Sequence, residues 1–477
     1  MRKLLISGTS AVVLAASIVA AQAGGFATRD QSAVGEGMAF AGEGTPGMGL
    51  SAMFWNPAAV TQVKGWGVEG DVSVAVPNGT ITTNTALTSP SIETLNSCTG
   101  GPATCDQTGN LFKDKVAPAF YGAVRVAPDW YLGLSVNSPF GVSTKIPGTG
   151  NPPAPLSYAA QQLGTGANIR SVDVNPVVGW KVNNVLSVAV GPQFLWWRND
   201  FDRDLIPLFS GGGANLEAMI ATQTHAFGAG ITAGITYTPS PATEIALGYR
   251  SQVRLDLKGQ INIPPSLALL ASPVTAPFSG TAPSVTSSLT LPDQVNLGAR
   301  QRINDAWTLL GTIEWTHWSG TQGAPFVFTN GPTPGAVGDT LFLNYRNSWY
   351  LAAGAEYRAT AATTVRAGIG YDVSPVQGTL GWINIPGANS TSASIGLSHK
   401  LTDRLTFDVG YSYTWIANQT IIAGPGNPDQ TKLDTLIPGV FNTWAGNVAS
   451  HSQAVSVALR YDFAEQAAHP SIITKAK

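Results

Sequence analysis

The sequence has little charge. Asp, Glu, Lys and Arg make up 11% of its 477 residues, against roughly 25% in soluble domains, and the formal net charge is −2. A soluble protein of this length would be short of surface charge, and a nucleic-acid-binding protein would need a basic field. The composition therefore argues against nucleic acid as a partner and suggests that much of the surface does not face water.

Cysteine and histidine are also scarce. The chain has five histidines and two cysteines. The cysteines, Cys98 and Cys105, lie in a stretch rich in Gly, Pro and Thr. In an oxidising compartment this spacing suits a disulfide that closes a loop. Metal binding is the alternative, but no His or further Cys lies nearby to complete a ligand set. Because no Ser/His/acid cluster, metal-ligand spacing or phosphate-loop context appears, we expect no catalytic residues, no metal and no cofactor.

Long apolar runs are absent after the N-terminus. Arg2 and Lys3 precede an apolar stretch from Leu4 to Ala21, and Ala21-Gln22-Ala23 has the small residues of a cleavage site. Residues 1–23 are predicted to be a secretory signal peptide, because the apolar core is short for the roughly 20 residues of a membrane anchor. No later segment is apolar for long enough to span a membrane as a helix. The mature chain is therefore predicted to be exported.

From Trp66 onward, apolar residues alternate with small or polar ones. Between Leu405 and Trp415, for example, Leu, Phe, Val, Tyr, Tyr and Trp occupy every second position. This period predicts fourteen strands, near residues 66–76, 117–127, 129–138, 170–183, 184–198, 224–239, 242–258, 289–304, 305–318, 345–358, 362–374, 391–402, 404–418 and 452–463. Six tight turns alternate with seven long loops, so we predict an all-β, 14-stranded antiparallel barrel.

Aromatic pairs distinguish a membrane barrel from a soluble sandwich or propeller, whose strands also alternate. Eight residues separate Trp307 from Trp315 and Trp349 from Tyr357. Eight tilted residues rise about 19–20 Å, close to the roughly 25 Å apolar band between aromatic girdles. We therefore predict a transmembrane barrel in the outer membrane of a Gram-negative bacterium.

Charged residues recur on the face that this register turns toward the lumen. They are Arg250, Arg254, Glu314, Glu356, Arg366, Asp372 and Arg460. For most of them we expect ion pairs that brace the wall. Arg250 and Arg366 are the better candidates for binding a ligand carboxylate, because a guanidinium can hold it with two hydrogen bonds. On that hypothesis Arg366→Ala would weaken binding of that ligand.

Several motifs, in order, resemble one family. They are Gly24-Gly25-Phe26, Gly42-Glu43-Gly44, Asn56-Pro57-Ala58, Tyr249-Arg250-Ser251, Ser288 to Pro292, Glu314 to Ser319, Arg366 to Asp372 with Ser374-Pro375-Val376, and Ile385-Pro386. The chain from Gly24 to Phe463 is similar to the FadL-type long-chain fatty-acid transporters, which include toluene and xylene channels. The resemblance departs at Gly387 to Ser390, where the family usually has acidic and Arg-Trp residues, and in the tail 464–477 beyond the aromatic Phe463.

The resemblance implies site residues. Residues 24–65 would form a plug, or hatch, inside the lumen, with Phe26 inserted into the binding pocket and Asn56, Pro57 and Ala58 as the plug signature. The alternatives are a disordered terminus for Phe26 and an ordinary turn at Asn56-Pro57. Pro139, Phe140 and Gly141 would kink the third strand and open a side window in the barrel of residues 66–463; otherwise the strand simply ends there.

The function expected from the resemblance is a channel for passive uptake of hydrophobic molecules, most of all long-chain fatty acids, with sideways release through the wall. Aromatic hydrocarbons are the alternative substrate, and a general porin or a structural barrel is the alternative class. Apolar outer loops, from Asp202 to His225 and from Asn262 to Pro283, suggest an entry groove or a packed cap. We expect a monomer whose partners are the substrate, outer-membrane lipid and lipopolysaccharide.

Overall fold

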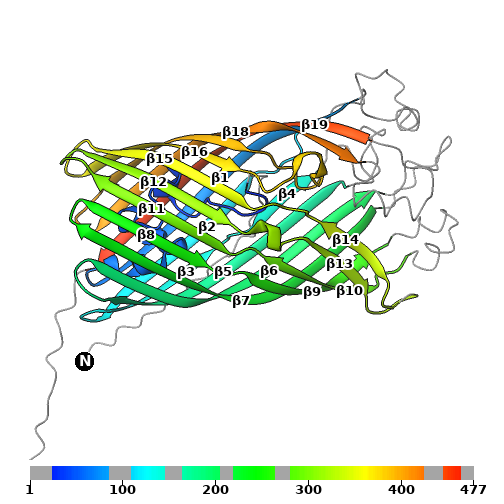
Figure 1. Cartoon of the computed structure of the whole chain (residues 1–477), viewed down its shortest axis with the longest axis horizontal. Helices are drawn as coiled ribbons and strands as arrows, with labels where there is room; N and C mark the ends of the chain where they lie inside the picture. Colours follow the sequence, from blue (N-terminus) through cyan, green and yellow to red (C-terminus); the bar gives the residue numbers. More distant parts are fainter. Residues whose placement is uncertain are drawn as a thin grey trace, which may run out of the picture.

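The computed structural model describes residues 24–84, 109–145, 164–204, 219–263, 280–332, 334–423 and 444–463. They form one antiparallel sheet that closes on itself, because β1 (Trp66–Thr83) pairs with β19 (Trp444–Phe463) along its whole length. Figure 1 shows the resulting barrel, with the N-terminal segment in blue inside it. The signal peptide, Cys98, Cys105 and the tail 464–477 lie outside the described residues, so those predictions stay as they were.

The wall has fourteen strands, as the alternation predicts. Nine are continuous: β1, β2 (Lys115–Ala127), β5 (Gly166–Lys181), β6 (Leu186–Asp204), β7 (Met219–Ser240), β16 (Thr363–Val373), β17 (Ser390–Lys400), β18 (Leu405–Ala423) and β19. Five are broken once and carry two labels each: β3 (Trp130–Asn137) and β4 (Gly141–Lys145), β8 (Thr243–Arg250) and β9 (Val253–Asn262), β10 (Ser284–Leu291) and β11 (Gln294–Arg302), β12 (Trp307–Thr316) and β13 (Gly323–Phe328), β14 (Val337–Phe342) and β15 (Ser348–Arg358).

The burial of side chains is the reverse of that in a soluble protein. On β1, Val72, Val74 and Val76 are exposed on the outer face, whereas Asp71 and Ser73 are buried inside. An apolar face exposed all around a closed barrel matches a lipid surrounding, where each backbone N–H and C=O must be paired within the sheet. The alternation thus turns the apolar side of strands such as β1 toward lipid.

Residues 24–65 occupy the lumen on the short-turn side as a series of short helical segments. These are α1 (Ala33–Glu36), η1 (Pro46–Met48), η2 (Leu50–Phe54) and η3 (Pro57–Gln62), and together we call residues 24–65 the plug. Two further turns are η6 (Trp318–Gly320), in the break between β12 and β13, and η7 (Gly378–Leu380), between β16 and β17. Of the helical segments that the structure describes, none is long and apolar enough to cross a membrane.

Glycines in the wall let the plug backbone approach closely. A Cβ atom added to Gly298 of β11 would lie 1.9 Å from the carbonyl oxygen of Glu43, and one added to Gly248 of β8 would lie 1.8 Å from that of Trp55. Any larger residue at these two positions would push the plug inward. The plug is therefore fitted to the wall by backbone contact as well as by side chains.

Candidate functional site

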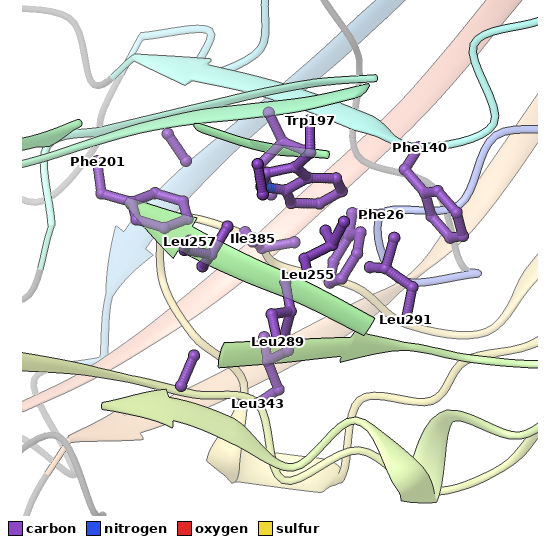
Figure 2. Packing of buried hydrophobic residues seen from close by; sticks show 14 of the residues in the cluster. Phe26, Phe140, Trp197, Phe201, Leu255, Leu257, Leu289, Leu291, Leu343 and Ile385 are labelled. Atoms are coloured by element: carbon purple, nitrogen blue, oxygen red, sulfur yellow. The ribbon is translucent and has the colours of Figure 1, made fainter. Parts of the chain in front are cut away.

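An apolar cluster fills the lumen beyond the plug, around Phe26. The ring of Phe26 is 1% exposed and lies 4.8 Å from the ring of Trp318, 5.8 Å from Trp197 and 6.0 Å from Phe140, between centroids. Figure 2 shows Phe26 between Phe140 and Trp197. We call the buried side chains packed here the Phe26 cluster; they include Phe26, Phe140, Trp197, Phe201, Leu255, Leu257, Leu289, Leu291, Trp318, Leu343, Tyr345, Trp382 and Ile385.

The breaks in the wall strands bring these apolar side chains inward. Before the break between β8 and β9, the inward residue is Arg250; after it, Val253, Leu255 and Leu257 point inward and are buried. Arg250 and Val253 are three residues apart, whereas a regular strand turns only residues an even number apart to the same side. Each broken strand can therefore carry a polar inner face on one side of its break and an apolar one on the other.

The plug holds Phe26 in place by pairing with the broken third strand. The N–H of Gly141 donates to the carbonyl of Phe26 at 2.8 Å, and the N–H of Thr28 donates to that of Pro139 at 2.9 Å. The Thr28 hydroxyl also donates to the carbonyl of Ser138 at 2.6 Å. Residues 138–140, between β3 and β4, thus pair with the plug backbone as they would with a neighbouring strand.

The same break interrupts the ladder between the second and third wall strands. The β2–β3 ladder ends at the pair Phe120↔Val136, and beyond the gap the segment before β2 pairs with β4, where the N–H of Lys113 donates to the carbonyl of Ser143 at 3.2 Å. Side chains of the plug and of β2 meet beside this gap: Lys115 forms a buried ion pair with Asp30, and the Tyr121 hydroxyl donates to the carbonyl of Gln31 at 2.7 Å. The third strand therefore breaks and then resumes as β4, with the plug lining the break.

Asn56 both begins η3 and ties the plug to β7. Its side-chain oxygen accepts from the N–H of Ala58 at 3.0 Å, as a helix N-cap does, while Pro57 takes the first helical position. Its amide nitrogen donates to the carbonyls of Gly44 and Ile235, both at 3.1 Å. The turn expected at Asn56-Pro57 is thus present and also anchors the plug to the wall.

A charge cluster lies at the plug side of Phe26. The guanidinium of Arg29 forms ion pairs with Glu314 of β12 at 2.5 Å and with Asp372 of β16 at 2.6 Å, and it stacks over the ring of Tyr350 at 3.8 Å. Glu43 of the plug lies 3.9 Å from the same guanidinium. Burial, reinforced by the nearby carboxylate of Glu314, raises the pKa of Glu43 well above its usual range. One arginine thus links the plug to two wall strands.

Arg250 and Arg366 both already have partners: Arg250 contacts groups of the wall and of the plug, and Arg366 contacts groups of the wall. Arg250 pairs with Asp173 at 2.7 Å and donates to the carbonyl of Phe54 at 3.0 Å. Arg366 pairs with Glu356 at 2.7 Å and donates to the hydroxyl of Ser398 at 2.5 Å. These contacts are those expected of bracing, and a role in ligand binding stays a prediction for both residues.

The inward position predicted for Arg254 is wrong. Its side chain is 74% exposed and pairs with the equally exposed Asp256 at 3.4 Å. The reason is the break at Ser251-Gln252, which shifts the register of β9 relative to β8.

Sequence reasoning missed several residues of the Phe26 cluster. Trp197 of β6, Tyr345 of the break between β14 and β15, and Trp382 of the connection between β16 and β17 carry no local motif. Trp318 stands only within a motif matched to the family. Among the described residues, no group of His, Cys, Asp and Glu gathers as metal ligands would. The apolar parts of the two outer loops, residues 205–218 and 264–279, lie outside the described residues.

A closed barrel with an apolar outer face, an interior plug and an enclosed apolar cluster defines a plugged channel of the outer membrane. Residues 12–463 match the family described as outer membrane protein transport proteins (OMPP1/FadL/TodX), so the chain belongs to that family and to the outer membrane of a Gram-negative bacterium. This confirms the family and the location that the motifs predict.

Named relatives agree with this assignment. The chain is 24% identical over 447 residues to the long-chain fatty acid transport protein of Escherichia coli K12, covering 87% of this chain and 94% of that one. It is 25% identical over 434 residues to outer membrane protein P1 of Haemophilus influenzae, covering 85% and 88%.

Solved structures share the fold. A FadL homologue from Pseudomonas aeruginosa superposes with a TM-score of 0.74 at 21% identity, covering 92% of this chain and all of that one. The toluene transporter TbuX of Ralstonia pickettii gives a TM-score of 0.61 at 16% identity, covering 91% and 100%. The chain therefore has the same fold as a FadL homologue and as a toluene transporter.

Proposed function

We propose that the protein takes up hydrophobic molecules passively across the outer membrane, with long-chain fatty acids as the first candidate substrate and aromatic hydrocarbons as the second. The observation that carries this proposal is the Phe26 cluster, an apolar site inside a membrane barrel that Phe26 of the plug fills. Ligand sites are mainly apolar with a few polar groups. A relative named for long-chain fatty acid transport and a solved structure named as a toluene transporter support the two candidates.

The route would run from the Phe26 cluster to the break in the third strand. A substrate that displaces Phe26 also disturbs the hydrogen bonds from Gly141 and Thr28, since both belong to the same backbone pairing. Release of that pairing would uncover the gap between β2 and β4, through which an apolar molecule reaches lipid without crossing water. The protein would act as a monomer among outer-membrane lipid and lipopolysaccharide, without catalysis.

The test is uptake of labelled oleate and labelled toluene by Gram-negative cells that lack their own such channel. We expect faster uptake with the protein, and loss of that gain when Pro139→Val, Phe140→Thr and Gly141→Val regularise the third strand. Pro192→Val is the matched control, because Pro192 lies in the continuous strand β6.

Three outcomes distinguish the alternatives. Uptake of toluene alone would make hydrocarbons the substrate. A correctly inserted barrel that accelerates neither substrate would contradict the proposal and favour a structural barrel. Large steady conductance steps in planar bilayers would instead indicate a general porin.

A further inference from the structure

Two polar atoms are buried without a partner in the Phe26 cluster. They are Nε1 of Trp318 and the hydroxyl oxygen of Tyr345, whose residues are 0% and 2% exposed. Within the part of the chain that the structure describes, neither atom has a hydrogen-bond partner. An unpaired buried donor costs about 1–3 kcal/mol. A native protein retains such a cost where a ligand or water supplies the missing partner.

The rings that carry both donors lie directly beside Phe26. The Trp318 ring is 4.8 Å and the Tyr345 ring 6.3 Å from the Phe26 ring, and the two rings are 5.4 Å from each other. A Cβ atom added to Gly25 would lie 3.3 Å from each of them. A ligand that replaces Phe26 would therefore contact both side chains.

A second neutral polar group lies farther along the cluster. Nε1 of Trp382, whose ring packs on Phe201 at 4.9 Å, and the side-chain amide of Asn384 are also buried and unpaired among the described residues. Figure 2 shows Phe201 on the other side of Trp197 from Phe140. The polar atoms that the cluster offers are thus hydroxyl, indole and amide groups, all uncharged.

The buried cations of the described segments are already neutralised. The basic side chains buried in the described segments are Lys115, Arg250 and Arg366, and each pairs with a carboxylate. Arg29, three residues after Phe26, serves two wall carboxylates. An ionised ligand carboxylate would therefore lose its hydration without gaining a counter-charge, which is strongly unfavourable.

We propose that this site selects uncharged ligands that join an apolar skeleton to a hydrogen-bond acceptor, such as an alcohol, an ester or a protonated acid, over the ionised carboxylate of the same skeleton. Trp318 and Tyr345 are the residues that determine this specificity, because their N–H and O–H groups donate to the acceptor once Phe26 has moved. The inference rests on the proposed function and names its substrate class.

The test compares ligands of one chain length on the full protein in lipid nanodiscs. Retention of labelled dodecane, 1-dodecanol and laurate is measured at pH 9, where laurate is ionised, with empty nanodiscs subtracted to remove partition into lipid. One hydrogen bond is worth about 0.5–1.5 kcal/mol, so we expect 1-dodecanol to bind roughly 3- to 10-fold more tightly than dodecane and laurate more weakly than 1-dodecanol.

Tyr345→Phe removes only the hydroxyl. This variant should weaken the binding of 1-dodecanol by roughly 3- to 10-fold. The affinity for dodecane should stay within about twofold of the wild-type value. The matched control is Tyr357→Phe on the outer face, where the side chain is 41% exposed. This control should change the affinity for neither ligand. Displacement of Phe26 is common to all ligands, so it cancels in the ratio of affinities.

The possible failures separate the two proposals. Equal binding of dodecane and 1-dodecanol, equal weakening of both by Tyr345→Phe, or laurate binding more tightly than 1-dodecanol would overturn the selectivity and leave the hydrophobic channel in place. Retention of none of the three ligands would contradict the channel itself.

Discussion

The two ends of the lumen differ although the same strands build both. Toward the short turns, the interior holds the plug and the ion pairs of Arg29, Arg250 and Arg366. Beyond the strand breaks it holds the Phe26 cluster, whose members are apolar or aromatic. The outer face must be apolar where it meets lipid, but beyond the break into β9 it carries the exposed pair Arg254 and Asp256 instead. The inner face is free of that requirement, and its change of character marks the site.

The largest effect is expected from Arg29→Met, which removes the cation that joins plug and wall. Glu314, Asp372 and Glu43 would remain near one another without their arginine, and breaking a buried ion pair on one side costs about 3–5 kcal/mol. We expect the plug to detach, seen as raised single-channel conductance in planar bilayers.

Arg29→Lys keeps the charge but cannot pair with Glu314 and Asp372 at the same time, as the guanidinium does. Its conductance should therefore lie between those of the wild type and Arg29→Met. Conductance in Arg29→Met that stays at the wild-type value would show that backbone fit alone holds the plug.

A smaller effect is expected from Phe26→Ala at the boundary of the two regions. Phe26 competes with ligand for the apolar cluster, and loss of a buried Phe ring typically removes about 3–5 kcal/mol. Affinity for labelled oleate should therefore rise by at least about tenfold, since 1.4 kcal/mol corresponds to tenfold.

Phe40→Ala is the control, because Phe40 packs on Trp55 inside the plug at 5.7 Å and away from the Phe26 cluster. A fall in oleate affinity for Phe26→Ala would mean that this ring forms part of the bound site.

The smallest effect on ligand is expected from Arg366→Ala in the polar region. The pairing of Arg366 with Glu356 and Ser398 favours a bracing role. The affinity for oleate should therefore stay within about twofold of the wild-type value, while the free energy of unfolding in urea falls by about 1–3 kcal/mol. Equilibrium binding and denaturation curves of the refolded barrel measure the two. A clear loss of affinity at unchanged stability would return Arg366 to the ligand site.

The sequence predicts the wall better than the site. Alternation is a local signal, so each of the fourteen strands can be predicted from its own residues, as Leu405 to Trp415 show for one of them. Arg254 shows the limit of that signal, because one irregular pair, Ser251-Gln252, reverses the face of everything after it. A proline marks two of the five breaks, at Pro139 and Pro292, but the others carry none within the gap.

The Phe26 cluster depends on contacts that no local pattern reveals. Phe26 and Trp318 are separated by more than half of the sequence, and their meeting requires both the closed barrel and the folded plug. Only resemblance pointed to Phe26, and nothing in the sequence singled out Tyr345. Positions in a lumen are set by the closure of the whole sheet, which is a long-range property.

The backbone pairing of Phe26 also has a consequence for biogenesis. Gly24 lies two residues before Phe26, and a Cβ atom on Gly24 would lie 3.4 Å from the carboxylate of Asp372. With signal-peptide cleavage predicted after Ala23, the new amino terminus would form inside the site. Maturation would then place a new ammonium group beside the carboxylate of Asp372, next to the backbone pairing that holds Phe26.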